Sequence, residues 1–250
     1  MRVIVTRPAA QAAHWAQALR ERGIDALALP LIDIAPPLEL APLEQAWRQL
    51  AQQRLVVFVS PTAVEQFFAY RPAGGRWPDD LAAASIGAGT TQALQQQGVA
   101  TVIEPPADAP QFDSEALWAR LSERDWAGAP VLIVRGDGGR DWLADTLRRS
   151  GARPSFVTAY RRGAPQWNAD AMVQLEDALT HPADTLWFFS SSQAIDHLLQ
   201  LCAGRSWAAA RALATHPRIA EHARANGFGE VHETRPTLDA VAACIQSIAS

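Results

Sequence analysis

Apolar strand-like runs alternate with amphipathic segments along the chain, and this alternation constrains the fold more than any other feature. The run "VIVTR" is typical of a buried strand, and the following "QAAHWAQALRERG" has helical spacing and ends at Gly23. The same order continues through "LVVFVS" and "PTAVEQFFAY", then "AAASIG" and "TTQALQQQG". Strands that alternate with helices of this length predict an α/β fold with parallel sheets and right-handed crossovers.

The second half of the chain repeats the order of the first. Its opening segments "VLIVRG" and "RDWLADTLRRSG" match "RVIVTRP" and its following helix. Arg7 and Arg135 lie 128 positions apart, as do Gly23 and Gly151. This constant offset predicts an internal duplication that gives two doubly wound, flavodoxin-like domains, each with a five-stranded parallel sheet.

Composition narrows the classes of function. The 250 residues are 48% apolar, which is enough for two cores, and the net charge of −4 argues against a nucleic-acid partner. The N-terminus enters "VIVT" directly and no apolar run has the roughly 20 residues that span a bilayer, so we expect a cytoplasmic protein without a membrane partner.

The sequence has no lysine, which excludes Schiff-base chemistry and the Walker A motif. Cys202 and Cys244 are expected to be buried thiols.

Ligands of doubly wound sheets bind at the carboxyl ends of the strands, where the strand order reverses. The turns expected there are "TRPA" and "SPTA" in one repeat and "RGDGGR" and "SSSQ" in the other. Arginine, hydroxyls and helix N-termini together suit an anion, and we expect two such sites to face one cleft. Gly138 and Gly139 lack the third glycine of the dinucleotide fingerprint and indicate a tight turn, to which Arg135 and Arg140 add charge for a carboxylate or phosphate.

Metal and hydrolase sites are not indicated. No histidine pair has metal-ligand spacing beside a carboxylate, so the six histidines are expected to be solvated or capping. "FFSSSQ" lacks the G-x-S-x-G elbow, so Ser190 and Ser192 are expected to be N-caps or ligand donors. Tyr160 ends "FVTAYRR", where its hydroxyl, with an ordinary pKa of roughly 10, could donate a proton. Taken alone, the residues favour a strand aromatic there.

The ordered motifs "VTRP", "PLIDIAP", "VVFVSPTAVEQFF", "SIGAGTTQAL", "VLIVRGDGGRDWLADTLRRSGA", "VTAYRR", "FFSSSQAI" and "THPRIAEHARANGF" resemble the uroporphyrinogen-III synthase family across nearly the whole chain. The resemblance implies a cofactor-free hydro-lyase of heme biosynthesis, which cyclises hydroxymethylbilane to uroporphyrinogen III with inversion of the terminal ring and loss of water. It also implies exchanged domains, residues 1–35 plus 166–250 and residues 36–165, joined by two linkers near 33–40 and 161–167.

The resemblance assigns roles to single residues. Tyr160 matches the tyrosine proposed to assist departure of the hydroxyl, and Ser60, Thr90 and Ser190 match hydroxyl positions that face the cleft. Members often have a Gly-Pro-Thr-Thr-like turn where this chain has Thr215 to Arg218, so His216 or Arg218 is the candidate there for substrate carboxylates. The expected site has Tyr160 as catalytic residue, no metal, and, for binding a linear tetrapyrrole, Arg7, Ser60, Thr90, Arg135, Gly138, Gly139, Arg140, Ser190, Ser192, His216 and Arg218.

A non-enzymatic alternative belongs to the same architecture. Duplicated two-domain α/β proteins with crossing linkers also bind anionic small molecules without turnover. Such proteins usually carry an aromatic sugar platform or an attached DNA-binding helix pair, and the sequence indicates neither. We therefore expect an enzyme that acts as a monomer, with the binding module as the alternative.

Overall fold

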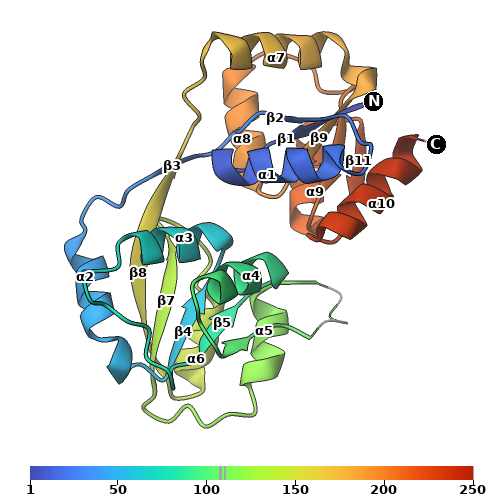
Figure 1. Ribbon diagram of the computed structural model, residues 1–250. Helices are drawn as coiled ribbons and strands as arrows, with labels where there is room; N and C mark the ends of the chain where they lie inside the picture. The colour runs from blue at the N-terminus through green and yellow to red at the C-terminus, as the bar shows by residue number, and fades with distance from the viewer. Residues whose placement is uncertain (107–108, 110, 250) are drawn as a thin grey trace. The chain divides into compact units, whose positions relative to one another are not determined.

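The computed structural model describes residues 1–106, 109 and 111–249, and the chain forms two compact units (Figure 1). One unit consists of Met1–Ile34 and Gly163–Ser250, and the other of Ala35–Arg162. Each unit is built on a sheet flanked by helices, and the α/β class with parallel sheets is as predicted. No described helix has the length and apolar character needed to cross a membrane.

The sheet of the first unit has the order β11-β10-β9-β1-β2, and all its pairs are parallel. Its strands are β1 (Arg2–Val5), β2 (Ala26–Ala28), β9 (Thr185–Phe189), β10 (Arg211–Ala214) and β11 (Glu230–Glu233). Alternate residues of a strand face opposite sides of its sheet, so both faces of the central strand β9 are apolar. Leu186 and Phe188 belong to one core cluster, and Trp187 and Phe189 to the other.

Helices cover both of these faces. The first cluster is closed by α1 (Ala9–Arg20) and α10 (Leu238–Ala249), and the second by α7 (Ala169–Thr180), α8 (Ser192–Leu201) and α9 (Pro217–Ala225) (Figure 1). A short 3₁₀ helix, η2 (Pro182–Asp184), precedes β9. Cys202 and Cys244 are free thiols, the first buried and the second partly exposed.

His197 departs from the expected behaviour of the histidines. It lies on the inner side of α8 and is buried, with Nδ1 2.6 Å from the carbonyl oxygen of Leu31. This single hydrogen bond to backbone is compatible with an otherwise apolar environment, so the expectation that all histidines are solvated or capping is wrong at this position.

The sheet of the second unit has the order β3-β8-β7-β4-β5-β6. Its strands are β3 (Asp33–Ala35), β4 (Leu55–Phe58), β5 (Ala83–Ser85), β6 (Val102–Ile103), β7 (Pro130–Gly136) and β8 (Arg153–Gly163). The start of β3 and the last residue of β8 lie beyond the unit's boundaries at Ala35 and Arg162. The prediction of five strands is wrong here, because the short strand β3 pairs with the edge of β8. With its 11 residues, β8 is longer than β7 and offers unpaired backbone groups to a further strand.

Helices again lie on both faces of this sheet. They are α2 (Ala41–Arg48), α3 (Pro61–Ala69), α4 (Ala88–Gln96), α5 (Ser114–Leu121) and α6 (Trp142–Arg149), with the 3₁₀ helix η1 (Leu50–Gln52) after α2. Trp47 of α2 stacks on Phe67 of α3 with ring centroids 4.7 Å apart, and Phe58 of β4 lies 5.6 Å from Phe67. On the other face, α5 and α6 pack on Leu55, Val57 and Ile133.

The strand order reverses once in each sheet, between β1 and β9 in the first unit and between β7 and β4 in the second. The strands of these pairs are parallel, so their carboxyl ends meet at one edge of each sheet. These two switch points are where a doubly wound sheet offers a binding site.

Candidate functional site

Tyr160 lies at the carboxyl-terminal edge of the second sheet. The β7–β8 register shifts between Arg135 and Gly136, so that Gly136 is opposite Tyr160. A Cβ atom on Gly136 would lie 3.0 Å from Cζ of Tyr160, so the ring would have to shift by a few tenths of an ångström to accommodate it. Glycine therefore lets the ring lie against the neighbouring strand, and the tyrosine side chain is fully buried there.

The Tyr160 hydroxyl joins two other polar side chains. Its oxygen lies 3.1 Å from Oγ of Ser60 and accepts a hydrogen bond of 2.8 Å from Nη2 of Arg162. Ser60 is the N-cap of α3, and its Oγ also accepts from the backbone N–H of Ala63 at 3.0 Å. Two of the predicted residues, Ser60 and Tyr160, are thus in direct contact at the switch point.

Arg162 was not predicted as a site residue. A signal for it exists in the sequence, because residues i and i+2 of a strand face the same side and Arg162 follows Tyr160 by two positions in "YRR". The pattern does not predict that the guanidinium hydrogen-bonds to the hydroxyl of Tyr160, because this contact depends on the side-chain conformation of Arg162. Arg161, one position earlier, donates instead to the carbonyl oxygen of Pro36 at 3.0 Å.

The two arginines of the "RGDGGR" turn are both paired with carboxylates. Arg135 lies over the ring of Phe156 at 3.8 Å and donates to Asp141 at 2.6 Å, and Arg140 forms an ion pair with Glu115 at 3.1 Å. The turn also contains the predicted Gly138 and Gly139, and the φ of +147° at Gly139 is one that residues with a side chain rarely adopt. The charge predicted for this turn is present, but partners within the unit already neutralise much of it.

Thr90 lies in the first turn of α4 and is buried. The neighbouring Thr91 makes the polar contacts that join this helix to the sheet: its Oγ1 lies 2.7 Å from Oγ of Ser85 and donates to Glu104 at 2.7 Å. Among the described residues, Thr90 therefore makes no hydrogen bond to Ser60 or Tyr160.

Arg7 follows β1 at the switch point of the first unit. Its guanidinium lies over the ring of Trp15 at 4.3 Å and 5.8 Å from the ring centroid of Phe188. Its Nε is buried and has no hydrogen-bond partner among the described residues, and burial lowers the pKa of Arg7 from its ordinary value to about 10. A buried donor without an acceptor is costly, and an anion that accepted a hydrogen bond from Nε would remove this cost.

Two helices begin beside Arg7 without side-chain caps. Pro8 precedes α1 and Ser191 precedes α8, and neither side chain hydrogen-bonds to its helix. The N-cap expected of Ser190 or Ser192 is therefore wrong, because the extended residue before the helix is Ser191 and Ser192 is already helical. Neither N-cap side chain therefore offsets the positive end of its helix dipole, which favours negative charge at this edge.

The turn after β10 supplies the last predicted residues. His216 is the N-cap of α9, and its Nδ1 accepts a hydrogen bond of 3.2 Å from the backbone N–H of Arg218. The Arg218 side chain is exposed. His216 thus has a capping role, while Arg218 carries an exposed positive charge at the same sheet edge.

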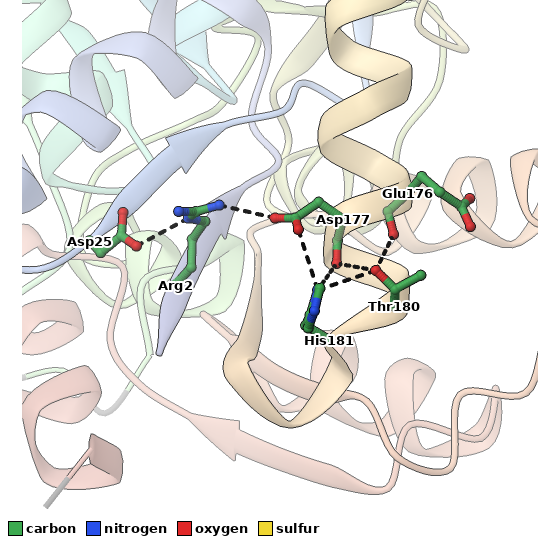
Figure 2. Close-up of polar contacts among 6 residues, drawn as sticks. All are labelled: Arg2, Asp25, Glu176, Asp177, Thr180 and His181. Atoms are coloured by element: carbon green, nitrogen blue, oxygen red, sulfur yellow. Dashed lines mark hydrogen bonds and ion pairs between the residues drawn. The ribbon is translucent and has the colours of Figure 1, made fainter.

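The opposite, amino-terminal edge of the first sheet is different. Figure 2 shows Arg2 of β1 between Asp25 and Asp177, with ion pairs of 3.1 Å to each, and His181 3.3 Å from Asp177. Arg2 at this edge is therefore paired with two carboxylates. Within the described part of the chain, no three histidine, cysteine or acidic residues are arranged to hold a metal ion.

Known proteins are similar to this chain in sequence over most of its length. The family model described as "Uroporphyrinogen-III synthase HemD" matches residues 13–243. Uroporphyrinogen-III synthase of Salmonella typhimurium is 29% identical over 92% of this chain and 94% of its own, and that of Synechococcus elongatus is 30% identical over 83% and 78%.

Solved structures share the fold at lower identity. Uroporphyrinogen-III synthetase from Helicobacter pylori superposes with a TM-score of 0.60 at 17% identity, covering 99% of this chain and 98% of that one. A uroporphyrinogen III synthase from Thermus thermophilus gives 0.59 at 16% identity, covering 100% and 97%. With the family model matching most of its length, the chain belongs to the uroporphyrinogen-III synthase family.

Proposed function

We propose that this chain cyclises hydroxymethylbilane to uroporphyrinogen III, with inversion of the terminal ring and loss of water, in heme biosynthesis. The observation that carries the proposal, beside family membership, is the buried hydroxyl of Tyr160 in contact with Ser60 and Arg162 at a sheet switch point. The contact offers hydroxyl groups and a guanidinium, which can hydrogen-bond the leaving oxygen and supply a proton to it.

The chemistry begins with departure of the terminal hydroxyl. The C–O bond breaks, the leaving oxygen takes a proton and departs as water, and the N-protonated (cationic) azafulvene remains. Tyr160 has no exposed surface whereas Ser60 is partly exposed, so we assign the contact with the leaving hydroxyl to Oγ of Ser60 and the proton source to Tyr160 behind it. The proton returns when the attacked ring carbon loses its own at closure, so one water is the net loss.

Ring inversion is a matter of conformation. The same substrate closes without inversion, to isomer I, when no enzyme is present, so the protein must hold the azafulvene until the spiro intermediate forms. The protein can hold the substrate in the required conformation by binding its eight carboxylates. We assign one of them to Arg7 and to the N-termini of α1 and α8, where the unpaired Nε of Arg7 and the positive ends of the two helix dipoles favour an anion.

The proposal includes the origin of the fold. Read from β2, the first sheet follows the order second, first, third, fourth, fifth strand, and the second sheet follows it too when β7 and β8 are taken as its first two strands. This parallel order supports an internal duplication in which the two halves have exchanged their initial strands.

Isomer analysis tests the function directly. Freshly prepared hydroxymethylbilane is incubated with the purified chain, the products are oxidised, and the isomers are separated. We expect uroporphyrin III to predominate with enzyme and uroporphyrin I without it. Isomer I alone at saturating protein, together with measurable binding of the product, would support the non-enzymatic binding module instead.

A further inference from the structure

The position of Arg162 beside Tyr160 goes beyond the roles assigned above. Its Nη2 lies 2.8 Å from the phenol oxygen, and its Cζ lies 5.4 Å from the centroid of the same ring. The backbone N–H of Arg162 donates to Oδ1 of Asp137 at 3.3 Å, which ties this end of β8 to the turn after β7. Backbone and side chain are therefore both held next to the tyrosine.

The hydrogen-bonding capacities of the three groups fix where the protons lie. A guanidinium can only donate, so the phenol oxygen of Tyr160 accepts from Arg162. The buried phenol proton then needs an acceptor, and among the described residues Ser60 Oγ is the one within reach, at 3.1 Å. Ser60 Oγ accepts a second time from Ala63, so its own proton is directed away from both partners.

We propose that Arg162 is a positioning residue that directs the Tyr160 proton toward Ser60 and stabilises the phenol oxygen when that proton leaves. A cation that donates to an oxygen stabilises negative charge developing on it, and in a buried contact this stabilisation is larger than in water. The inference rests on the proposed function, because it requires that Tyr160 supplies a proton.

A graded set of variants separates charge from packing. Arg162→Met removes the donor and keeps much of the aliphatic volume, Arg162→Gln keeps a neutral donor, and Arg162→Lys keeps the charge. We expect kcat to fall by about 10- to 100-fold in the Met variant, with KM changed by less than about threefold. The Gln variant should lie between Met and Lys, and Lys should recover part of the loss. A loss of stability alone would not follow this order.

A double-mutant cycle with Tyr160 is the decisive measurement. If Arg162 acts through the phenol, Arg162→Met should cost kcat little in a Tyr160→Phe background. Arg153→Met is the matched control, because Arg153 lies on the same strand at its other end and donates to the carbonyl of Gly128 at 2.9 Å. It should leave kcat unchanged.

The outcomes separate this inference from the function on which it rests. A wild-type chain that forms no isomer III contradicts the proposed function itself. With an active wild type, a full additional kcat loss in the Tyr160→Phe background would overturn the Arg162 proposal, and so would a rise in KM at constant kcat, which would assign Arg162 to a substrate carboxylate. If the Met variant does not fold, the Lys and Gln variants in both backgrounds give the same test.

Discussion

An arginine lies near each end of strand β1, and the two side chains have opposite surroundings. At the amino end, Arg2 is half exposed and forms ion pairs with Asp25 and Asp177. At the carboxyl end, Arg7 has no ion pair among the described residues, lies over the ring of Trp15, and has a buried Nε without a hydrogen-bond partner. Five positions along the chain thus separate an arginine with two ion pairs from one without any among the described residues.

We infer from this difference that the amino-terminal edge of the sheet serves stability and the carboxyl-terminal edge serves binding. Taking a charge out of water without a partner is costly, and natural proteins retain such sites where a ligand later supplies the counter-charge. Substitutions at the carboxyl-terminal edges should therefore change catalysis or affinity more than stability. Substitutions at the amino-terminal edges should do the reverse.

The largest effect expected at a carboxyl-terminal edge is that of Tyr160→Phe. The ring and its contact with Gly136 remain, while the proton source is lost, so kcat should fall by about 10²-fold or more. The ratio of isomers III to I at fixed enzyme concentration measures the effect, because uncatalysed closure then outruns the enzyme.

Tyr70→Phe is the matched control. Tyr70 ends α3 at the far edge of the same unit and is the other tyrosine of the chain. Its replacement should leave the isomer ratio unchanged. Near wild-type turnover in a folded Tyr160→Phe variant, checked by circular dichroism, would show that Tyr160 is a strand aromatic without a role in catalysis.

Arg7→Met should weaken substrate binding and stabilise the fold at once. Loss of a charge-assisted contact should lower kcat/KM by about 10- to 100-fold. Methionine can still pack on Trp15 and carries no charge to desolvate, so the melting temperature should rise by about 2–4 °C. Steady-state kinetics and thermal unfolding measure the two effects.

The same substitution at the other end of β1 gives the contrast. Arg2→Met leaves Asp25 and Asp177 without their shared partner, and because both pairs are about half exposed, each contributes only about 0–1 kcal/mol, so the melting temperature should fall slightly while kcat/KM stays close to wild type. A fall in melting temperature for Arg7→Met as large as that for Arg2→Met would erase the distinction between the two ends.

The lowered pKa of Arg7 makes its contribution depend on pH. Folding lowers this pKa from its ordinary value to about 10, so between pH 10 and that ordinary value the folded state binds fewer protons than the unfolded state, and this contribution to the free energy of unfolding rises with pH. The affinity for a carboxylate changes with pH in the opposite direction, because deprotonation of Arg7 removes the positive charge that binds the carboxylate. Product affinity should weaken as pH rises through 10, by about tenfold at pH 11. Isothermal titration of wild type and Arg7→Met tests this, because the variant should lack that fall.

The sequence indicates backbone features of the site better than side-chain directions. Hydrophobic alternation predicts the parallel strands, and the turns after them predict where Arg7, Ser60 and the 137–141 loop lie. The rest depends on tertiary contacts that no local pattern encodes. The sequence pattern predicts that Trp15 is a core residue of a helix, and the structure places the guanidinium of Arg7 over its ring. The pattern predicts that Arg162 is part of a linker, and the structure shows its side chain hydrogen-bonded to the hydroxyl of Tyr160.

The smallest effect expected at a carboxyl-terminal edge is that of Arg140→Ala. Arg140 and Glu115 are both more than two-fifths exposed, and an exposed pair of this kind contributes about 0–1 kcal/mol, so the melting temperature should change little. Glu115 already neutralises part of the charge, so we expect KM to rise by only about two- to threefold, and this rise should disappear as added salt screens the substrate carboxylates. Measuring KM from low to high ionic strength in wild type and variant checks this. If Arg140→Ala instead matched Arg7→Met at every salt concentration, a paired exposed arginine would be as important for binding as an unpaired buried one, and the contrast between satisfied and unsatisfied cations would no longer identify the binding edge.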